Sequence, residues 1–268
     1  MAEHLLDVRH LQTVFHMGEG LVKAVDDATF HVDSGEIIGI VGESGSGKST
    51  ILHGIQGLLP KTSARKGTIS LFGKSIDHMS AAELKRIRGR DVAMIFQDTG
   101  RYMNPISRIG KQYTAFLKIH EKKPVSELVE LQKEMLHRVH LEDTDRILHA
   151  YPFELSGGMR QRVGIAMAMS LRPKLLLADE PTSALDVTVQ AQVIYEMMEL
   201  REKYGTTIIF VTHSMGVASY MSDVIGVMQN GKLVEWGKTE DVISSPRQEY
   251  TRSLLDSVIE LQDERLNR

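Results

Sequence analysis

The sequence contains no cysteine among its 268 residues. This absence excludes disulfides, thiolate metal sites, iron–sulfur clusters and cysteine nucleophiles. Long apolar runs are also missing, because the longest, such as Leu175–Ala178 and Ile208–Val211, fall far short of the ~18 residues of a membrane span. The first residues, from Met1 to Glu3 onward, show no basic-then-apolar leader, so we expect no export.

Neither sign of charge dominates, since 32 Lys and Arg residues stand against 35 Asp and Glu residues and give a net charge of −3. This balance argues against a protein that binds nucleic acid through bulk electrostatics. Apolar residues make up 42% of the chain and charged residues 25%, which are ordinary values for a globular protein. We therefore expect a soluble, cytosolic protein.

The order of short apolar segments predicts an α/β organisation. Four β-rich pieces come first, and the last of them is nearly all apolar, as in a strand buried on both faces: Leu5–Val8, Leu21–Val25, Ala28–Val32 and Glu36–Val41. A helix is predicted over Lys48–Leu59, ended by Pro60. Helical spacing dominates from Asp98 to Pro173, and a strand–helix–strand order then returns, which implies a parallel sheet.

A glycine-rich loop lies between the buried run Ile37–Val41 and the first predicted helix. Its sequence, Gly42-Glu43-Ser44-Gly45-Ser46-Gly47-Lys48-Ser49, has the spacing of a phosphate loop. Glycines let backbone N–H groups surround phosphate oxygens, and the helix N-terminus adds partial positive charge. In such a loop, Lys48 reaches the β- and γ-phosphates and the Ser49 hydroxyl is a ligand of Mg²⁺. The loop therefore predicts a nucleotide site.

Two acids end the apolar run Leu175–Ala178, at the carboxyl edge of the predicted sheet, where α/β sites form. Asp179 suits the surroundings of Mg²⁺, as in other phosphate-loop enzymes. Glu180 is placed to polarise a water for in-line attack on the γ-phosphate. A strand can also end in solvated acids without a function, but the phosphate loop favours a catalytic interpretation.

A more specific motif, Leu155-Ser156-Gly157-Gly158-Met159-Arg160-Gln161-Arg162, comes just before that strand and opens an apolar helix. A serine N-cap followed by glycines accounts for the local residue types. It does not account for their occurrence in fixed order with the other motifs. The sequence resembles the ATP-binding subunit of ATP-binding cassette (ABC) transporters, over residues 5 to about 240.

The resemblance implies roles for several further residues. Phe15 resembles the aromatic that stacks on adenine, although a core strand Phe is the competing interpretation. Gln97 resembles the glutamine that contacts Mg²⁺ and the attacking water, and His213 the histidine that senses the γ-phosphate. Ser183-Ala184-Leu185-Asp186 resembles a loop that crosses a dimer interface.

Three sets of site residues follow from these motifs and the resemblance. The expected catalytic residues are Glu180, His213, Gln97 and Lys48. The expected magnesium ligands and contacts are Ser49, Gln97 and Asp179. The expected nucleotide contacts are Phe15, Gly42, Glu43, Ser44, Gly45, Ser46, Gly47, Lys48, Ser49, Thr50, Ser156, Gly157, Gly158, Gln161 and Asp186.

The resemblance also implies the architecture and the cofactors, ATP and Mg²⁺. We expect an α/β fold: a phosphate-loop NTPase (RecA-like) core with an N-terminal antiparallel β subdomain and an inserted α-helical subdomain. The nucleotide-binding domain is expected over residues 1–240, with the helical subdomain at about 98–172. A short helical tail is expected over 241–268, with one apolar face formed by Tyr250, Leu254, Val258 and Leu261.

The resemblance further implies that two subunits complete each site. Ser156 and the Gly157 and Gly158 amides of one subunit would face the γ-phosphate held by the phosphate loop of another. ATP would then join the subunits and hydrolysis at Glu180 would loosen them, so a monomer should hydrolyse ATP poorly. Both halves of the site are present, so a homodimer and a heterodimer with a related subunit are both allowed.

Three segments resemble one branch of the family, the oligopeptide, dipeptide and nickel importers. One of them is Tyr151-Pro152-Phe153-Glu154, ahead of the Leu155–Arg162 motif. The other two are 178–192, with its Asp-Val-Thr-Val-Gln-Ala-Gln stretch, and Pro246–Thr251, in which Gln248-Glu249 replaces the usual His-Pro. Ser214 stands where the family has Asp, and Thr99–Met103 differs from the usual sequence. Larger members carry a cysteine-rich tail, and short nickel-type members lack it, so both peptides and nickel or a metal chelate remain possible cargo.

The leading hypothesis is the ATP-hydrolysing subunit of a membrane importer, a peripheral protein on the cytoplasmic face of the cell membrane. The implied partners are two transmembrane permease subunits, a second ATP-binding subunit and, indirectly, an extracytoplasmic substrate-binding protein; nucleic acid is not expected. The alternative is a non-transport ABC ATPase, such as a subunit of a soluble enzyme complex. A weaker third hypothesis, a regulatory module without hydrolysis, is disfavoured by Glu180 and His213.

Overall fold

The computed structural model describes residues 4–17, 20–183 and 185–256. The chain divides into two compact units, which are described separately. The first unit contains the residues up to Leu84 and those from Thr207 onward, and the second contains Lys85–Thr206. In the described part of the chain, no helix is long and apolar enough to cross a membrane.

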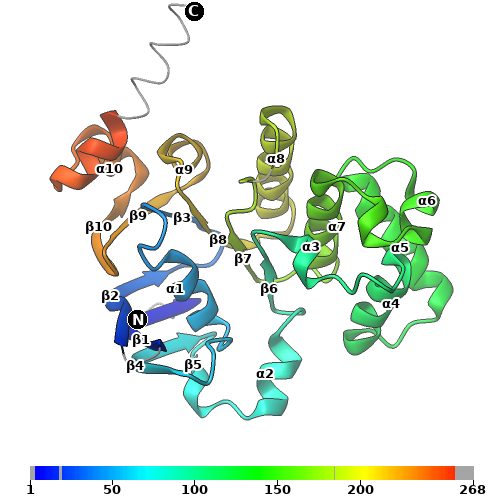
Figure 1. Cartoon of the computed structure of the whole chain (residues 1–268), viewed down its shortest axis with the longest axis horizontal. Helices are drawn as coiled ribbons and strands as arrows, with labels where there is room; N and C mark the ends of the chain where they lie inside the picture. Colours follow the sequence, from blue (N-terminus) through cyan, green and yellow to red (C-terminus); the bar gives the residue numbers. More distant parts are fainter. Residues whose placement is uncertain (1–3, 18–19, 184, 257–268) are drawn as a thin grey trace, which may run out of the picture. The chain divides into compact units, whose positions relative to one another are not determined.

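An antiparallel sheet forms the N-terminal part of the first unit (Figure 1). Its strand order is β2-β1-β4-β5. The strands are β1 Leu6–Met17, β2 Gly20–Val32, β4 Ser63–Leu71 and β5 Lys74–Ser75, followed by a 3-10 turn at Ile76–His78 and α2 Ala81–Ile87. The sheet confirms the predicted N-terminal antiparallel subdomain.

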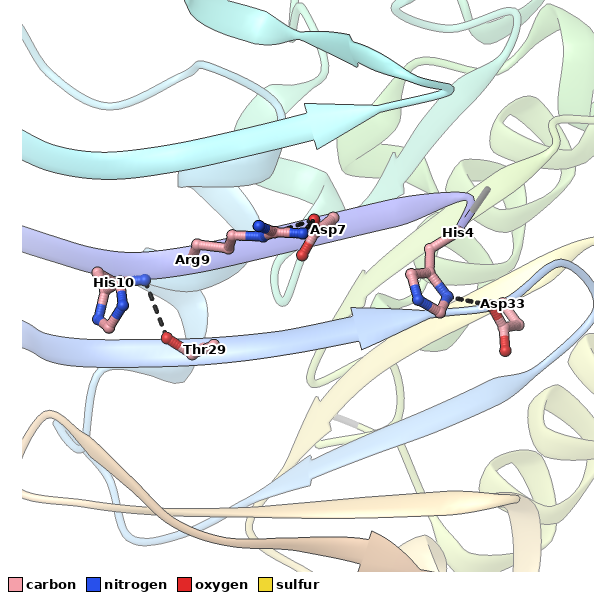
Figure 2. Close-up of polar contacts among 6 residues, drawn as sticks. All are labelled: His4, Asp7, Arg9, His10, Thr29 and Asp33. Atoms are coloured by element: carbon pink, nitrogen blue, oxygen red, sulfur yellow. Dashed lines mark hydrogen bonds and ion pairs between the residues drawn. The ribbon is translucent and has the colours of Figure 1, made fainter. Parts of the chain in front are cut away.

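A bulge in β1 allows the first strand to continue past Val8, where the predicted piece Leu5–Val8 ends. His10 has a left-handed backbone (φ 50°), and its N–H donates to the Thr29 hydroxyl at 2.9 Å, as Figure 2 shows. On β2, Asp27 is also left-handed (φ 66°) beside a register shift. The prediction of two separate strands, Leu21–Val25 and Ala28–Val32, is therefore wrong, because a bulge rather than a turn joins them.

Parallel strands form the second sheet region of the first unit. The central strand β3 (Ile37–Val41) is buried along its whole length and pairs in parallel with β8 (Thr207–Thr212) and β9 (Val224–Gln229). At the edge, β10 (Lys232–Lys238) pairs with β9 in the antiparallel sense through the predicted Asn230-Gly231 turn, where both residues have positive φ. The buried apolar strand places its carboxyl end, and the loop after it, at one edge of the sheet.

The helices of the first unit are short: α1 Lys48–Ile55, α9 Met215–Met221 and α10 Thr239–Ser244. The prediction that α1 continues to Leu59 and stops at Pro60 is wrong. Gly57 adopts a left-handed conformation (φ 64°), and the Leu58 N–H donates to the His53 carbonyl at 2.8 Å. This glycine-centred C-cap ends the helix before the proline is reached.

The last described segment is helical from 249 to 256. Tyr250 and Leu254 are half-buried and Thr251 is buried, so this segment packs on the first unit. Val258 and Leu261, predicted on the same face, lie outside the described residues.

Helices dominate the second unit, with a two-stranded parallel pair of β6 (Val92–Ile95) and β7 (Leu175–Asp179). The expected helical region between the strands contains five α-helices and a 3-10 turn at Pro152–Glu154 (Figure 1). They are α3 Thr99–Tyr102, α4 Ile109–His120, α5 Val125–Arg138, α6 Thr144–His149 and α7 Gly157–Met169. The long helix α8, Val187–Tyr204, follows β7.

Candidate nucleotide site

The phosphate loop connects β3 to α1 and turns tightly at its glycines. Gly42 (φ 152°) and Gly47 (φ 103°) have backbones that side chains rarely adopt. A Cβ at Gly42 would lie 2.1 Å from the Met228 carbonyl oxygen, and one at Gly47 would lie 2.1 Å from that of Ala24. Glycine is therefore required at both ends of the loop, by backbone angle and by space.

Lys48 begins α1 and folds over the loop that precedes it. Its ammonium group donates to the carbonyls of Gly42 and Glu43, each at 2.7 Å, and lies 3.4 Å from the Ser46 hydroxyl. The side chain is buried, whereas Glu43, Ser44 and Gly45 are exposed. No acid lies in the first turn of α1, so nothing on that turn opposes an anion at the helix N-terminus.

The remaining predicted residues of this region, Ser49 and Thr50, follow Lys48 directly on α1. Ser49 and Thr50 are half-buried in the first turn of α1. The β9–β10 hairpin supports the loop from one side, because the Gly231 N–H donates to the Ser46 carbonyl at 3.1 Å. The loop is thus held by its own lysine and by a neighbouring hairpin.

His213 follows β8 directly, at the carboxyl edge of the strand next to β3, and is exposed. Ser214 replaces the family's Asp and caps α9, since its hydroxyl accepts the Val217 N–H at 3.3 Å. Serine and aspartate are both good N-caps, which gives this departure a physical reason. Phe15 lies near the end of β1 and is half-buried rather than fully in the core.

Gln97 and Glu180 meet in the second unit. Each follows one of two adjacent parallel strands, β6 and β7, and the Gln97 amide nitrogen donates to the Glu180 carboxylate at 3.0 Å. Glu180 has a left-handed backbone (φ 42°), an uncommon conformation for a residue with a side chain. Asp179, at the end of β7, is buried. The parallel strand ends therefore bring together the amide and the carboxylate that the sequence predicts.

The Leu155–Arg162 motif forms the start of α7. Ser156 is the N-cap, and its hydroxyl accepts the Met159 N–H at 3.2 Å. No atom would lie within 4 Å of a Cβ at Gly157, so the glycine faces open space. Gly158 lies close to the Leu185 side chain, at 3.4 Å from a Cβ built there. The helix N-terminus is therefore accessible at the first glycine.

Gln161, a predicted nucleotide contact, makes its hydrogen bonds within the protein. Its side chain is buried and uses both groups of its amide inside the protein. The nitrogen donates to the carbonyls of Phe96 (3.2 Å) and Pro181 (3.1 Å), and the oxygen accepts from the Thr99 hydroxyl (2.8 Å) and N–H (3.4 Å). Because all four hydrogen-bonding positions are occupied, we infer that Gln161 positions the segments after β6 and β7, and its contact with nucleotide stays a prediction.

Asp186 is exposed and caps α8, because its carboxylate accepts the Val189 N–H at 3.1 Å. In the same predicted loop, Ser183 is exposed and donates from its hydroxyl to the Glu180 carbonyl at 3.2 Å. Ala184 lies outside the described residues. Thr99 and Gln161 form the contact that sequence reasoning missed, and no local pattern could reveal a bond between residues 62 positions apart.

A buried strand, a glycine-bounded loop and a lysine at the start of a helix define a phosphate-loop nucleotide-binding protein. The paired Gln97 and Glu180 add the groups of a nucleotide hydrolase. Comparison with known proteins gives the family. Residues 25–183 match the family described as ABC transporter, and the chain belongs to this family.

The similar curated proteins are ATP-binding subunits of transporters. A probable peptide ABC transporter ATP-binding protein, y4tR of Sinorhizobium fredii, is 42% identical over 96% of this chain and 77% of its own length. The oligopeptide transport ATP-binding protein OppD of Bacillus subtilis is 42% identical over 95% of this chain and 72% of its own. OppD of Salmonella typhimurium is also 42% identical, over 98% of this chain and 78% of its own.

The similar solved structures are ATP-binding cassettes. The dimeric cassette MJ0796 in a post-hydrolysis state, bound to ADP and Pi, superposes with a TM-score of 0.79 at 28% identity, covering 87% of this chain and 98% of that one. The cassette CbiO1 of Clostridium perfringens gives a TM-score of 0.74 at 24% identity over 97% of this chain and 99% of its own, which supports the fold alone. The chain is an ATP-hydrolysing cassette with the predicted phosphate-loop core.

Proposed function

We propose that this chain is the ATP-hydrolysing subunit of a peptide importer. The observation that carries the proposal is the set of family motifs, with Gln97 bonded to Glu180, in a chain 42% identical to peptide-transport ATP-binding proteins. The soluble-complex alternative is not favoured, because these relatives are described as transport subunits.

In the proposed reaction, each part of the chain has a defined task. The loop Gly42–Gly47 and the N-terminus of α1 bind the phosphates, and Lys48 leaves its carbonyl partners to neutralise phosphate charge. Glu180 accepts a proton from the attacking water, and Gln97 holds its carboxylate in place. His213 contacts the γ-phosphate.

The chain's oxygen donors fit magnesium, a hard cation that prefers oxygen ligands. To hold Mg²⁺, Ser49 would supply a hydroxyl and Asp179 a carboxylate. The Gln97 bond to Glu180 uses the amide nitrogen, so the amide oxygen is the atom left to face a cation. Bound Mg²⁺ would neutralise charge on the phosphate oxygens.

The proposed assembly pairs two cassettes. Ser156 and Gly157 of one subunit would contact the γ-phosphate held by its partner; the exposure of Gly157 supports this. Two membrane-spanning permease subunits would carry the cargo across the membrane, with a substrate-binding protein outside, and the cassette pair would work on the cytoplasmic face.

Cargo uptake is the experiment that tests the function. Cells that lack the gene should lose uptake of a labelled oligopeptide, and the intact gene should restore it. Because Lys48 holds the phosphates, Lys48→Ala should fail to restore uptake, whereas Lys61→Ala, a change at an exposed lysine of the same unit, should restore it. Loss of nickel uptake with unchanged peptide uptake would contradict the peptide assignment and favour a metal importer.

A further inference from the structure

A buried carboxylate holds the segment Pro246–Thr251 against β10. The Glu235 side chain accepts the Arg247 N–H at 2.8 Å and the Gln248 N–H at 3.3 Å. It also accepts the Thr251 hydroxyl at 2.5 Å, and the Thr251 side chain is completely buried. Three hydrogen bonds to one acid fix both the backbone before the terminal helix and the first turn of that helix.

The Glu235 carboxyl group, which holds the segment Pro246–Thr251, carries a charge. Burial favours the neutral acid, but the hydrogen bonds from Arg247, Thr251 and Gln248 outweigh it and lower the pKa of the carboxyl group. The group is therefore ionised at neutral pH. Hydrogen bonds to an ionised acceptor are stronger than neutral ones, so the segment is held firmly.

The neighbouring residue, Tyr250, reaches the phosphate loop. Its hydroxyl oxygen accepts the Glu43 N–H at 3.1 Å, a contact between residues 207 positions apart. The carbonyl of the same Glu43 accepts the Lys48 ammonium group at 2.7 Å. Glu43 is therefore held on one side by the end of the described chain and on the other by the lysine that binds phosphate.

This contact matters because the backbone of the loop is built on glycines. Gly42, Gly45 and Gly47 all have positive φ, and each glycine loses much conformational entropy when it is ordered. A contact that orders the loop before ATP arrives reduces the entropy lost on binding. Tyr250 accepts the hydrogen bond of one loop donor, the Glu43 N–H. The next two residues of the loop, Ser44 and Gly45, are exposed.

We propose that Tyr250 is a positioning residue for ATP: the segment Pro246–Thr251, anchored on Glu235, presets the phosphate loop through the Glu43 amide. The proposal rests on the ATP-binding part of the proposed function and not on its cargo. It makes the segment Pro246–Thr251 part of the nucleotide site through its contact with the phosphate loop.

The test removes one oxygen atom. Tyr250→Phe keeps the ring and loses the acceptor, so the dissociation constant for ATP should rise about 3- to 10-fold, the range for one hydrogen bond. The melting temperature should change by less than about 2 °C, because the ring still packs. Exchange of the Glu43 amide with deuterium should become faster, and a purely structural role of the ring would not change this rate.

Two further variants make the result decisive. Tyr220→Phe, which removes the hydroxyl of an exposed tyrosine in the same unit, should leave ATP affinity unchanged. Glu235→Gln should weaken ATP binding in the same direction, and combining it with Tyr250→Phe should add little, because both act through Glu43.

Unchanged ATP affinity in Tyr250→Phe would overturn the proposal, as would fully additive effects of the two changes. These measurements use the purified chain and ATP alone. If the wild-type chain binds ATP but does not support peptide uptake, the proposed cargo fails while the role of Tyr250 stands or falls on its own result.

Discussion

At the scale of single residues, two glutamines of the second unit have different tasks. Gln97 is exposed and holds the Glu180 carboxylate, so it acts on the group that would receive the proton. Gln161 is buried and joins the two backbone segments that follow β6 and β7. Their side chains are identical, and only the tertiary contacts distinguish the amide bonded to the Glu180 carboxylate from the amide buried among backbone groups.

Gln161→Leu tests the structural assignment. Leucine would leave the Phe96 and Pro181 carbonyls without their present partner, and an unsatisfied buried polar group costs about 1–3 kcal/mol. We expect the free energy of unfolding in urea to fall by roughly 2–4 kcal/mol. Thr99→Val removes only the Thr99 hydroxyl, which donates to the Gln161 amide oxygen and to the Phe96 carbonyl, and should cost less. Equal or negligible losses for both variants would argue against a central role for Gln161.

At the scale of elements, the sequence predicts strand cores better than element ends. Ile37–Val41 and Leu175–Ala178 are recognisable because uninterrupted apolar runs bury both faces of a strand. The end of α1 and the continuity of β2 were mispredicted, because Gly57 and Asp27 take left-handed conformations whose effect depends on bonds formed elsewhere. Local propensity cannot decide between a turn and a bulge when the partner strand supplies the hydrogen bonds.

The helix α8 carries a buried acid that its apolar spacing did not predict. The Glu196 side chain is 2% exposed, and its oxygens meet no hydrogen-bond partner by geometry in the described part of the chain. Burial raises the pKa of Glu196 to about 7, and the negative charge of Glu199 acts in the same direction. The side chain of Gln192 and the positive charge of Arg162 lower this pKa, but by less. His140, after α5, lies 3.9 Å away. The folded protein therefore binds this proton more tightly than the unfolded chain does.

This raised pKa predicts a pH-dependent stability. The folded state retains the proton between the ordinary glutamate pKa of 4.5 and the folded value of about 7, so stability falls as pH rises through this window and is level above it. Glu196→Gln removes the titration, and its stability advantage over wild type should grow by up to ~3 kcal/mol between pH 4 and pH 8. A difference that stays constant with pH in urea unfolding would contradict a buried, titrating Glu196.

At the scale of the whole molecule, the motifs fall in different units. The phosphate loop and His213 belong to the first unit, whereas Glu180, Gln97 and Ser156 belong to the second. The order of the motifs along the sequence was enough to predict the family, because chemistry constrains each residue type. The bond between Tyr250 and Glu43 could not be predicted from the sequence. It joins two segments of the first unit that are 207 positions apart, and only the tertiary fold brings them together.

The most direct test of the central claim is ATP turnover and assembly of Glu180→Gln. The variant keeps the shape of the side chain but cannot accept a proton, so it should bind ATP with near wild-type affinity and lose at least ~100-fold in turnover. Light scattering with ATP should then show a stable pair of chains. Glu202→Gln, at an exposed acid of the same unit, should behave as wild type. Normal turnover in Glu180→Gln, with no ATP-dependent pairing, would contradict the account.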